Sequence, residues 1–188
     1  MAKARPGMQP TQQDVQPVLN QLEQGQLEAA CDGARGLTKR FPKHFFGFNL
    51  LGTALSGLGR NAEAIEAYQR AVKLEPRMAD LHFNLGFALA AADRLEPASA
   101  SYRKALQINP KFFEAWGNLG TLAQRRGRLD EAITSYRKAL AIHEDAQGQF
   151  NLATALRDSG RLEEAIAAYT RSLALNPDNP DTHNNLGE

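Results

Sequence analysis

The sequence contains a single cysteine, Cys31, in 188 residues. One thiol cannot form a disulfide within the chain, so a secreted fold held together by disulfides is excluded. The same scarcity favours a reducing environment, and we expect a cytoplasmic protein. The basic N-terminal segment is not followed by an apolar stretch, and no apolar run is long enough to cross a bilayer. The sequence therefore predicts neither a signal peptide nor a membrane span.

An excess of charge of one sign is also lacking. Lysine and arginine together number 22 and aspartate and glutamate 21, which gives a formal net charge of +1 at pH 7. Binding to nucleic acid requires a basic face, and binding to a membrane surface requires a polybasic cluster. We therefore expect neither nucleic acid nor a membrane as partner.

Motifs for catalysis and for cofactors are missing as well. No two of the four histidines lie three or four residues apart, and there is no cysteine cluster, so no metal site is predicted. The glycines from Gly52 to Gly59 join two helical stretches, and no Gly-Lys-Ser/Thr follows them, so they are not a phosphate loop. Cys31 lies beside Ala30 on an alanine-rich stretch and is interpreted as a small core residue. We predict no catalytic residue, no metal, no cofactor and no enzyme activity.

Repetition is what the sequence has in abundance. Four ladders of residues share a period of 33 or 34 residues, with one gap in the last ladder. Their members are Gly52, Gly86, Gly120, Ala153 and Gly187; Tyr68, Tyr102, Tyr136 and Tyr169; Ala64, Ala98, Ala132 and Ala165; and Pro42, Pro76, Pro110 and Pro177. A shared period of this length is the signature of stacked structural repeats.

Each period holds two helical stretches, as residues 79–112 illustrate. Apolar side chains recur at helical spacing from Leu81 to Leu89 and again from Ala98 to Ile108. Asp93 and Arg94 separate the two stretches, and a proline ends the second because it cannot continue a helix. In the other periods a glycine suited to a left-handed conformation marks the break, at Gly59, Gly127 and Gly160. The sequence predicts an all-α fold.

The small residues of the first ladder lie in the middle of a helix. Glycine there costs about 1 kcal/mol relative to alanine. That cost is acceptable where another helix has to come close. A single hairpin is too small to bury its own apolar face, so we expect each hairpin to stack on its neighbours.

These ladders and this helix–turn–helix period resemble the tetratricopeptide repeat (TPR), and Trp116 stands where the family's pattern opens with tryptophan. The resemblance implies a right-handed superhelical solenoid of hairpins. After a disordered segment, 1–10, it predicts a single solenoid over 11–188. Its repeats are 11–44, 45–78, 79–112, 113–145 and 146–179, followed by a partial sixth, 180–188.

Three of these repeats depart from the pattern. The first is degenerate and rich in glutamine, and we interpret it as a polar N-terminal cap. The fourth is one residue short, because residues 142–145 replace the usual Asn-Pro turn. The sixth stops within its first helix, which leaves an apolar face around Leu173, Leu175 and Leu186 partly open. We expect either a piece of a longer protein or a face covered by another subunit, such as a second copy of the chain.

Asparagines recur on the first helices, which line the concave groove of the solenoid that the resemblance implies. They stand two residues before a member of the first ladder, each followed by a leucine, at Asn84, Asn118, Asn151 and Asn185, and Asn49 lies one step away from this position in the second repeat. An amide is both donor and acceptor, and asparagine is a mediocre helix former. We predict that these amides clamp the backbone of an extended peptide. Hydrogen bonding between adjacent hairpins is the alternative.

Other side chains are expected to face the same groove. The candidates are Phe83, Phe87, Thr121, Phe150 and Thr154. The phenylalanines would either contact a ligand or pack between hairpins. TPR domains that grip a C-terminal carboxylate use lysines and arginines in the groove. Arg125 and Arg157 are inward candidates here, but no lysine clamp is present, so that mode is not expected.

The asparagine ladder further resembles the superhelical TPR region of O-linked N-acetylglucosamine transferases and their bacterial relatives. In that family the asparagines hold acceptor proteins, which implies the same role for Asn84, Asn118, Asn151 and Asn185. The main hypothesis is a scaffold that binds a protein or peptide segment in its groove. The alternatives are the acceptor-recognition region of a larger glycosyltransferase- or sulfotransferase-type enzyme, and a self-associating structural scaffold.

Overall fold

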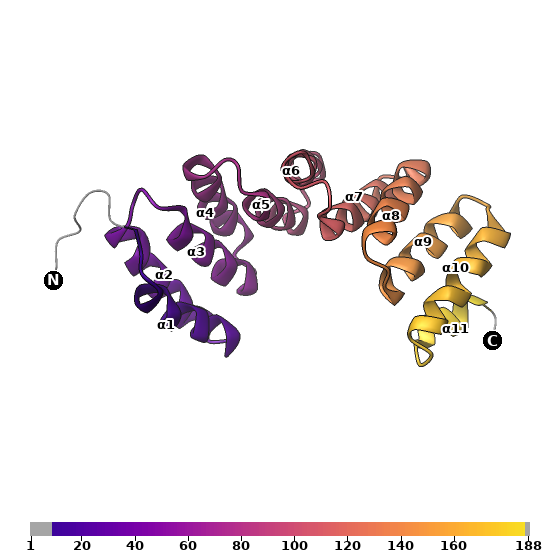
Figure 1. Ribbon diagram of the computed structural model, residues 1–188, viewed down its shortest axis with the longest axis horizontal. Helices are drawn as coiled ribbons and strands as arrows, with labels where there is room; N and C mark the ends of the chain where they lie inside the picture. The colour runs from indigo at the N-terminus through magenta and orange to yellow at the C-terminus, as the bar shows by residue number, and fades with distance from the viewer. Residues whose placement is uncertain (1–8, 187–188) are drawn as a thin grey trace. The chain divides into compact units, whose positions relative to one another are not determined.

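The structure is a computed structural model that describes residues 9–186. Within that range every regular element is an α-helix, so the all-α prediction is confirmed (Figure 1). The helices are α1 (Gln12–Glu23), α2 (Leu27–Arg40), α3 (Phe45–Gly57), α4 (Asn61–Leu74), α5 (Ala79–Ala91), α6 (Leu95–Ile108), α7 (Phe113–Arg125), α8 (Leu129–Ile142), α9 (Ala146–Asp158), α10 (Leu162–Leu175) and α11 (Pro180–Leu186). Most of the predicted disordered segment 1–10 and the last two residues of the partial repeat 180–188 lie outside the described residues.

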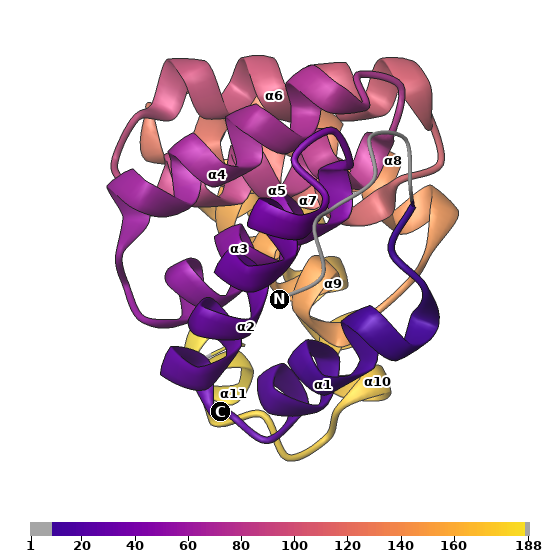
Figure 2. The same cartoon turned by 90° about the vertical axis from the view of Figure 1, so that its left-hand side faces the viewer.

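The chain divides into two compact units, which we call the N-terminal unit, 1–108, and the C-terminal unit, 109–188. In the N-terminal unit each helix from α1 to α6 packs on the next, and the first helices α1, α3 and α5 also touch in turn (Figure 2). The C-terminal unit repeats this arrangement, with α7 against α8 and α9, and α10 against α9 and α11. Each unit is therefore a stack of helical hairpins. A single solenoid over 11–188 stays a prediction.

The breaks between paired helices lie where the sequence places them. Gly59, Gly127 and Gly160 have φ angles of 72°, 69° and 79°, in the left-handed region that glycine tolerates best. In the third hairpin Asp93 takes this conformation, with φ of 58°. The backbone N–H of the residue that follows the left-handed residue then donates to a carbonyl in the last turn of the first helix. In the third hairpin the Arg94 N–H donates to the Leu89 carbonyl over 2.9 Å.

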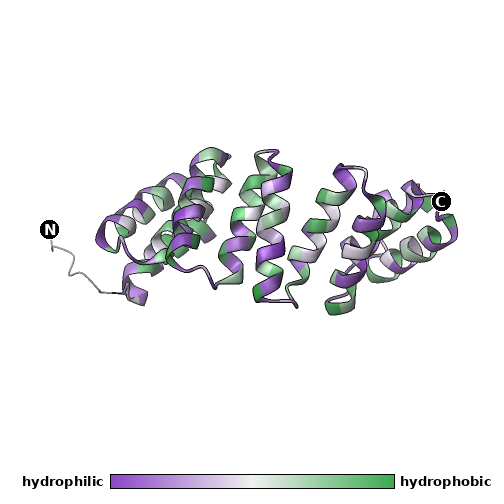
Figure 3. Cartoon of the chain, turned by 90° about the horizontal axis from the view of Figure 1, so that it is seen from above, coloured by the Kyte–Doolittle hydropathy of each residue, from purple (hydrophilic) through white to green (hydrophobic). Residues whose placement is uncertain are grey.

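The helices bury one face and expose the other, and apolar and polar residues alternate around them in Figure 3. The ladder residues form the buried face. The four alanines are 0–2% exposed, and the four tyrosines are 1–4% exposed. In the C-terminal unit the members Ala132, Tyr136, Ala153, Ala165 and Tyr169 belong to one hydrophobic cluster. The residues that repeat every 33 or 34 positions in the sequence are thus the residues that form the core.

The mid-helix glycines face the tyrosines of their own hairpins. A Cβ atom added at Gly52, Gly86 or Gly120 would lie 2.7, 2.8 or 2.6 Å from the ring of Tyr68, Tyr102 or Tyr136, respectively. Such distances are well inside van der Waals contact, so the ring occupies the space that a side chain would need. The expected close approach is confirmed, and its partner is the second helix of the same hairpin.

The open apolar face of the last hairpins extends beyond the residues that the sequence indicated. Leu173 and Leu186 are half-buried, and Leu186 packs against the core of the C-terminal unit. Among residues 9–186, the most exposed large apolar side chains are Leu162 and Ile166, at 59% and 56%. Both lie on α10 one helical turn apart, so they form one continuous patch.

Replacing Gly120 with alanine tests the contact between glycine and tyrosine. We expect Gly120→Ala to lower the free energy of unfolding by about 1–3 kcal/mol, because the Tyr136 ring must shift to admit the methyl group. Gly117, on the same helix, provides the matched control, because a Cβ atom added there would have nothing within 4 Å. Gly117→Ala should raise the free energy of unfolding by up to about 1 kcal/mol. Urea denaturation followed by circular dichroism measures both, and equal effects would contradict the packing argument.

Candidate functional site

The first two predicted asparagines meet each other in the N-terminal unit. Asn84 on α5 donates from Nδ2 to Oδ1 of Asn49 on α3, over 3.0 Å. Both side chains are half-buried. This bond joins adjacent hairpins, as the alternative interpretation of the ladder requires. It uses only one of the two N–H groups of Asn84 and leaves the Asn49 amide nitrogen free to donate elsewhere.

The two phenylalanines of α5 lie in different environments. Phe83 is half-buried, and its ring centroid is 5.6 Å from that of Tyr102. Phe87 is 54% exposed. At the equivalent position the second, fourth and fifth hairpins have a threonine. In each of them the threonine hydroxyl lies within hydrogen-bond distance of the buried tyrosine hydroxyl of the same hairpin. The N-terminal unit therefore presents one large aromatic side chain beside the Asn49–Asn84 pair.

The C-terminal unit contains a hollow of about 240 Å³ along α7, α8 and the start of α9. Three of the predicted groove residues, Asn118, Thr121 and Asn151, line it. The other lining residues are Phe113, Glu114, Gly117, Tyr136, Ala139, Leu140, Asp145, Gln147 and Gly148. We call this cavity the amide hollow.

The short fourth repeat builds the rim of the amide hollow. Helix α8 ends at Ile142 and α9 already begins at Ala146. The Asp145 carboxylate caps α9 by accepting the Gly148 N–H over 2.7 Å. A Cβ atom at Gly148 would lie 2.8 Å from the Leu140 side chain, so glycine lets α9 start against α8. The missing residue noted in the sequence therefore brings the first turn of α9 up to the cavity.

An exposed ion pair holds the same loop to the next hairpin. Two guanidinium nitrogens of Arg171 donate to the Glu144 carboxylate, over 2.8 and 2.7 Å. These hydrogen bonds, with a smaller contribution from Gln149, lower the pKa of Glu144 to about 2. Glu144 is therefore ionised at any physiological pH and keeps its ion pair with Arg171.

The polar side chains that line the amide hollow differ in how many of their hydrogen-bonding groups already have a partner in the protein. Gln147 donates to the Asn151 side-chain oxygen over 2.9 Å. Among residues 9–186, no group forms a hydrogen bond with the side-chain amide of Asn118, which is half-buried at the wall of the hollow. The Asn118 amide can therefore offer its full complement of donors and acceptors to a ligand.

The predicted threonines are engaged within their hairpins. The hydroxyl oxygens of Thr121 and Tyr136 are 3.2 Å apart, and those of Thr154 and Tyr169 are 3.1 Å apart. Burial raises the pKa of Tyr136, although the hydrogen bond to Thr121 acts in the opposite direction. These hydroxyl pairs fix the tyrosines whose rings pack on the first helices.

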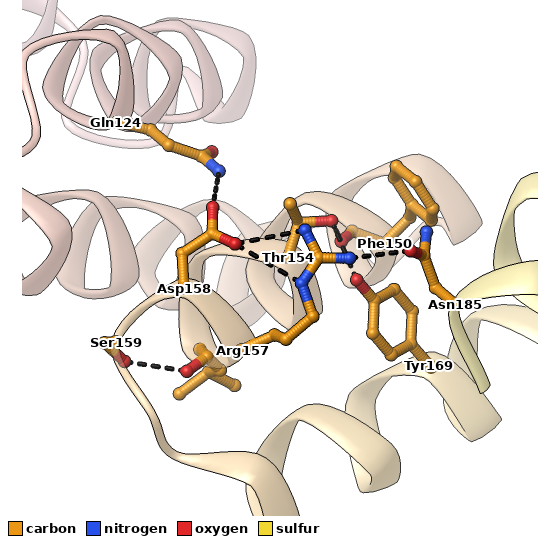
Figure 4. Close-up of polar contacts among 9 residues, drawn as sticks. Gln124, Phe150, Thr154, Arg157, Asp158, Ser159, Tyr169 and Asn185 are labelled. Carbon is orange, nitrogen blue, oxygen red and sulfur yellow. Dashed lines mark hydrogen bonds and ion pairs between the residues drawn. The ribbon is translucent and has the colours of Figure 1, made fainter. Parts of the chain in front are cut away.

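A run of polar side chains connects α7, α9 and α11 (Figure 4). Gln124 donates to the Asp158 carboxylate over 3.2 Å, and Arg157 donates to the same carboxylate over 3.0 Å. A second guanidinium nitrogen of Arg157 donates to Asn185 over 2.6 Å. Arg157 and Asn185, both predicted to face the groove, thus contact each other between adjacent hairpins.

Phe150 packs against the protein rather than projecting from it. Its ring meets that of Tyr169 edge-on, with centroids 5.7 Å apart, and it lies against the core of the C-terminal unit. Of the predicted residues, the structure brings Asn118, Thr121 and Asn151 together at one cavity. Asp145, Gln147 and Leu140 also line it, and the only sequence signal for them was the shortened fourth repeat.

Cys31 is fully buried on α2. Burial raises the pKa of its thiol, which keeps it in the unreactive protonated form. This agrees with its interpretation as a core residue. Within residues 9–186, no three histidine, cysteine, aspartate or glutamate side chains converge as ligands of a metal would. None of the helices in that range has both the length and the apolarity to span a membrane.

Removing the threonine partner of a ladder tyrosine tests these hydroxyl pairs. We expect Thr154→Val to lower the free energy of unfolding by about 1 kcal/mol, because the buried Tyr169 hydroxyl loses its hydrogen bond. Thr170 is the control, since its hydroxyl bonds to the Ile166 carbonyl of its own helix. Thr170→Val should change the free energy by less than half as much in urea denaturation. A larger loss for Thr170→Val would contradict this account.

Models of one family match the chain in several places. A model described as TPR repeat matches residues 52–93 and 153–188. Two described as tetratricopeptide repeat match residues 101–134 and 79–112. Between them the models cover residues 52–134 and 153–188, which is more than half of the chain.

Solved structures share the fold over most of the chain. A thermophilic TPR protein of Thermus thermophilus is 24% identical with a TM-score of 0.72, covering 94% of this chain and 96% of its own. MamA from Desulfovibrio magneticus RS-1 is 17% identical with a TM-score of 0.81, covering 90% and 96%. YrrB, described as a TPR protein with an unusual peptide-binding site, is 16% identical with a TM-score of 0.77, covering 93% and 91%.

One curated protein is similar over a short stretch. The small glutamine-rich tetratricopeptide repeat-containing protein 2 of Mycosarcoma maydis is 42% identical over 52 residues. These residues are 28% of this chain and 15% of that protein, so the likeness spans a small part of its length.

Proposed function

This chain belongs to the tetratricopeptide repeat family, and from that premise we propose that it is a scaffold that holds an extended segment of a partner protein. The contact surface is formed by the first helices of its hairpins. The observation that carries this proposal is the amide hollow, where the half-buried Asn118 side chain has no hydrogen-bond partner among the described residues.

The groups around Asn118 suit the backbone of a peptide. An extended segment presents an N–H and a C=O at every residue, and both need partners when water is excluded. The Asn118 amide supplies a donor and an acceptor at once, and the Asn151 amide nitrogen adds further donors. Contacts to backbone atoms do not depend on the partner's side chains, so they favour extended segments of varied sequence.

The N-terminal unit offers a second contact area of different character. There Asn49 and Asn84 use part of their hydrogen-bonding capacity on each other, and Phe87 is exposed beside them. An exposed aromatic ring of this size is a common anchor at protein interfaces. The peptide-binding description of YrrB, which shares the fold, is consistent with a peptide as ligand here.

The two asparagines of the amide hollow provide the test. Short random peptides selected by display against the full chain serve as the probe, with affinities measured by fluorescence anisotropy. We expect Asn118→Ala combined with Asn151→Ala to weaken binding roughly tenfold, because each lost hydrogen bond is worth about 0.5–1.5 kcal/mol. The helical circular dichroism signal should be unchanged.

A matched control separates binding from general effects. Asn176 lies at the C-terminal cap of α10, is exposed and is not part of the amide hollow. Asn176→Ala should leave the affinity unchanged. If no peptide is enriched by selection, or if the double variant binds the selected peptides as well as the parent does, the proposed function is wrong.

Self-association is a second candidate function, favoured by the exposed pair Leu162 and Ile166. The isoleucines equivalent to Ile166 in the second and fourth hairpins, Ile65 and Ile133, are only 4% and 2% exposed, because the next hairpin packs against their helices. On α10 the equivalent residue is 56% exposed. A second copy of the chain presents the same patch, so the two patches can cover each other in a twofold dimer.

Light scattering coupled to size exclusion tests this candidate across protein concentration. We expect a dimer at high concentration, and we expect Leu162→Gln combined with Ile166→Gln to make the chain monomeric, because burial of both side chains drives the contact. Ile142 is also exposed but lies on α8, so Ile142→Gln should leave the dimer intact. A parent chain that is monomeric at every concentration excludes self-association.

A further inference from the structure

The amide hollow also has a charge, and we propose that it selects a basic side chain, lysine or arginine, of the bound segment. This inference rests on the proposed peptide-binding function and deepens it. It is carried by three features of the cavity that are independent of the peptide backbone. The first is the apolar part of its lining. The second is a pair of carboxylates that form no ion pair with any described residue. The third is that no described residue of the lining is a lysine, an arginine or a histidine.

The apolar part of the lining suits the aliphatic part of a long side chain. Phe113, Ala139 and Leu140 contribute apolar surface to the hollow. The Phe113 ring contacts the His143 ring, with centroids 4.5 Å apart, and this contact restricts the orientation of the Phe113 side chain. Lysine and arginine side chains bury their methylene groups along such surfaces while the charged end stays near polar groups.

Two carboxylates provide the charge. Glu114 lies in the first turn of α7, and Asp145 lies at the N-terminal cap of α9. Both line the hollow, and neither makes an ion pair with any described residue. The neighbouring acidic residues differ in this respect, since Glu144, Asp158 and Glu164 are each paired with an arginine. Within the part of the chain that the structure describes, no lysine, arginine or histidine belongs to the lining.

The partial positive charges at the N-termini of α7 and α9 do not outweigh the negative charge of the two carboxylates. A helix N-terminus carries about half a positive charge, and one full carboxylate stands at each of the two termini. At α9 the Gly148 N–H is already satisfied by Asp145. A carboxylate or phosphate on the ligand would therefore meet two negative side chains, whereas a cation would be attracted.

The amide oxygens favour a cation that also donates hydrogen bonds. The Asn118 side-chain oxygen is unpartnered among the described residues, and Gln147 contributes a second amide to the lining. A guanidinium group has five N–H donors and no acceptor, and an ammonium group has three donors. Each can contact a carboxylate and an amide oxygen together, which a neutral apolar side chain cannot do.

The test uses a single residue as probe. The full chain, labelled with nitrogen-15, is titrated with N-acetyl-arginine N-methylamide and, separately, with its neutral isostere N-acetyl-citrulline N-methylamide. We expect arginine to shift the backbone N–H signals of Gly117 and Gly148, which line the hollow, and citrulline to bind roughly fivefold more weakly.

Isosteric variants assign the effect to the two carboxylates. Glu114→Gln combined with Asp145→Asn should reduce the affinity for the arginine probe roughly fivefold, because both attractive charges are removed. Asparagine at 145 keeps the helix cap, so the fold should be retained. Glu163→Gln combined with Asp178→Asn removes the same charge from two exposed carboxylates outside the hollow, and it should leave the affinity unchanged.

The outcomes separate this inference from the proposed function. Equal binding of arginine and citrulline, or shifts away from Gly117 and Gly148, would overturn the selection of a basic side chain. If selected peptides still depend on Asn118 and Asn151 in that case, the scaffold function stands alone. Arginine-selective shifts without any peptide binding would instead overturn the scaffold function and leave only a basic-residue site.

Discussion

In the second, third and fourth hairpins a buried tyrosine of the second helix packs directly against a glycine in the middle of the first. Gly120 and Tyr136 show this most clearly, since a Cβ atom added at the glycine would lie 2.6 Å from the ring. A larger residue on the first helix would push the two helices apart and uncover the tyrosine. The distance between paired helices, and with it the stacking of successive hairpins, depends on this contact.

The same contact determines what the first helices can present to a partner. With the tyrosine ring held in place, its hydroxyl meets a threonine of the first helix in most hairpins, as Tyr169 meets Thr154. On α7 the remaining surface includes Asn118 and, in the first turn, Glu114, which both line the amide hollow. The surface that we propose for binding a partner is thus a consequence of how the hairpin buries its own aromatic residue.

Variation between repeats gives the two units different surfaces. The third hairpin has Phe87 in place of threonine, which exposes an aromatic ring in the N-terminal unit. The fourth repeat lacks one residue, so Asp145 and Gly148 bring the start of α9 against α8 and complete the amide hollow. Departures from the repeat pattern, rather than the pattern itself, create the features that we propose bind a partner.

The sequence alone determined the helical class, the hairpin turns and the buried ladders, because each is encoded by local spacing. The left-handed turns at glycine or Asp93 can be located without knowledge of distant contacts. The same is true of the alanines and tyrosines that recur every 33 or 34 residues. Only the tertiary structure decided which asparagine is available. Asn84 bonds to Asn49, 35 positions away, and Asn185 bonds to Arg157, 28 positions away, while Asn118 has no such partner among the described residues. Hydrogen bonds between hairpins depend on side-chain distances across the stack, which no local spacing in the sequence specifies.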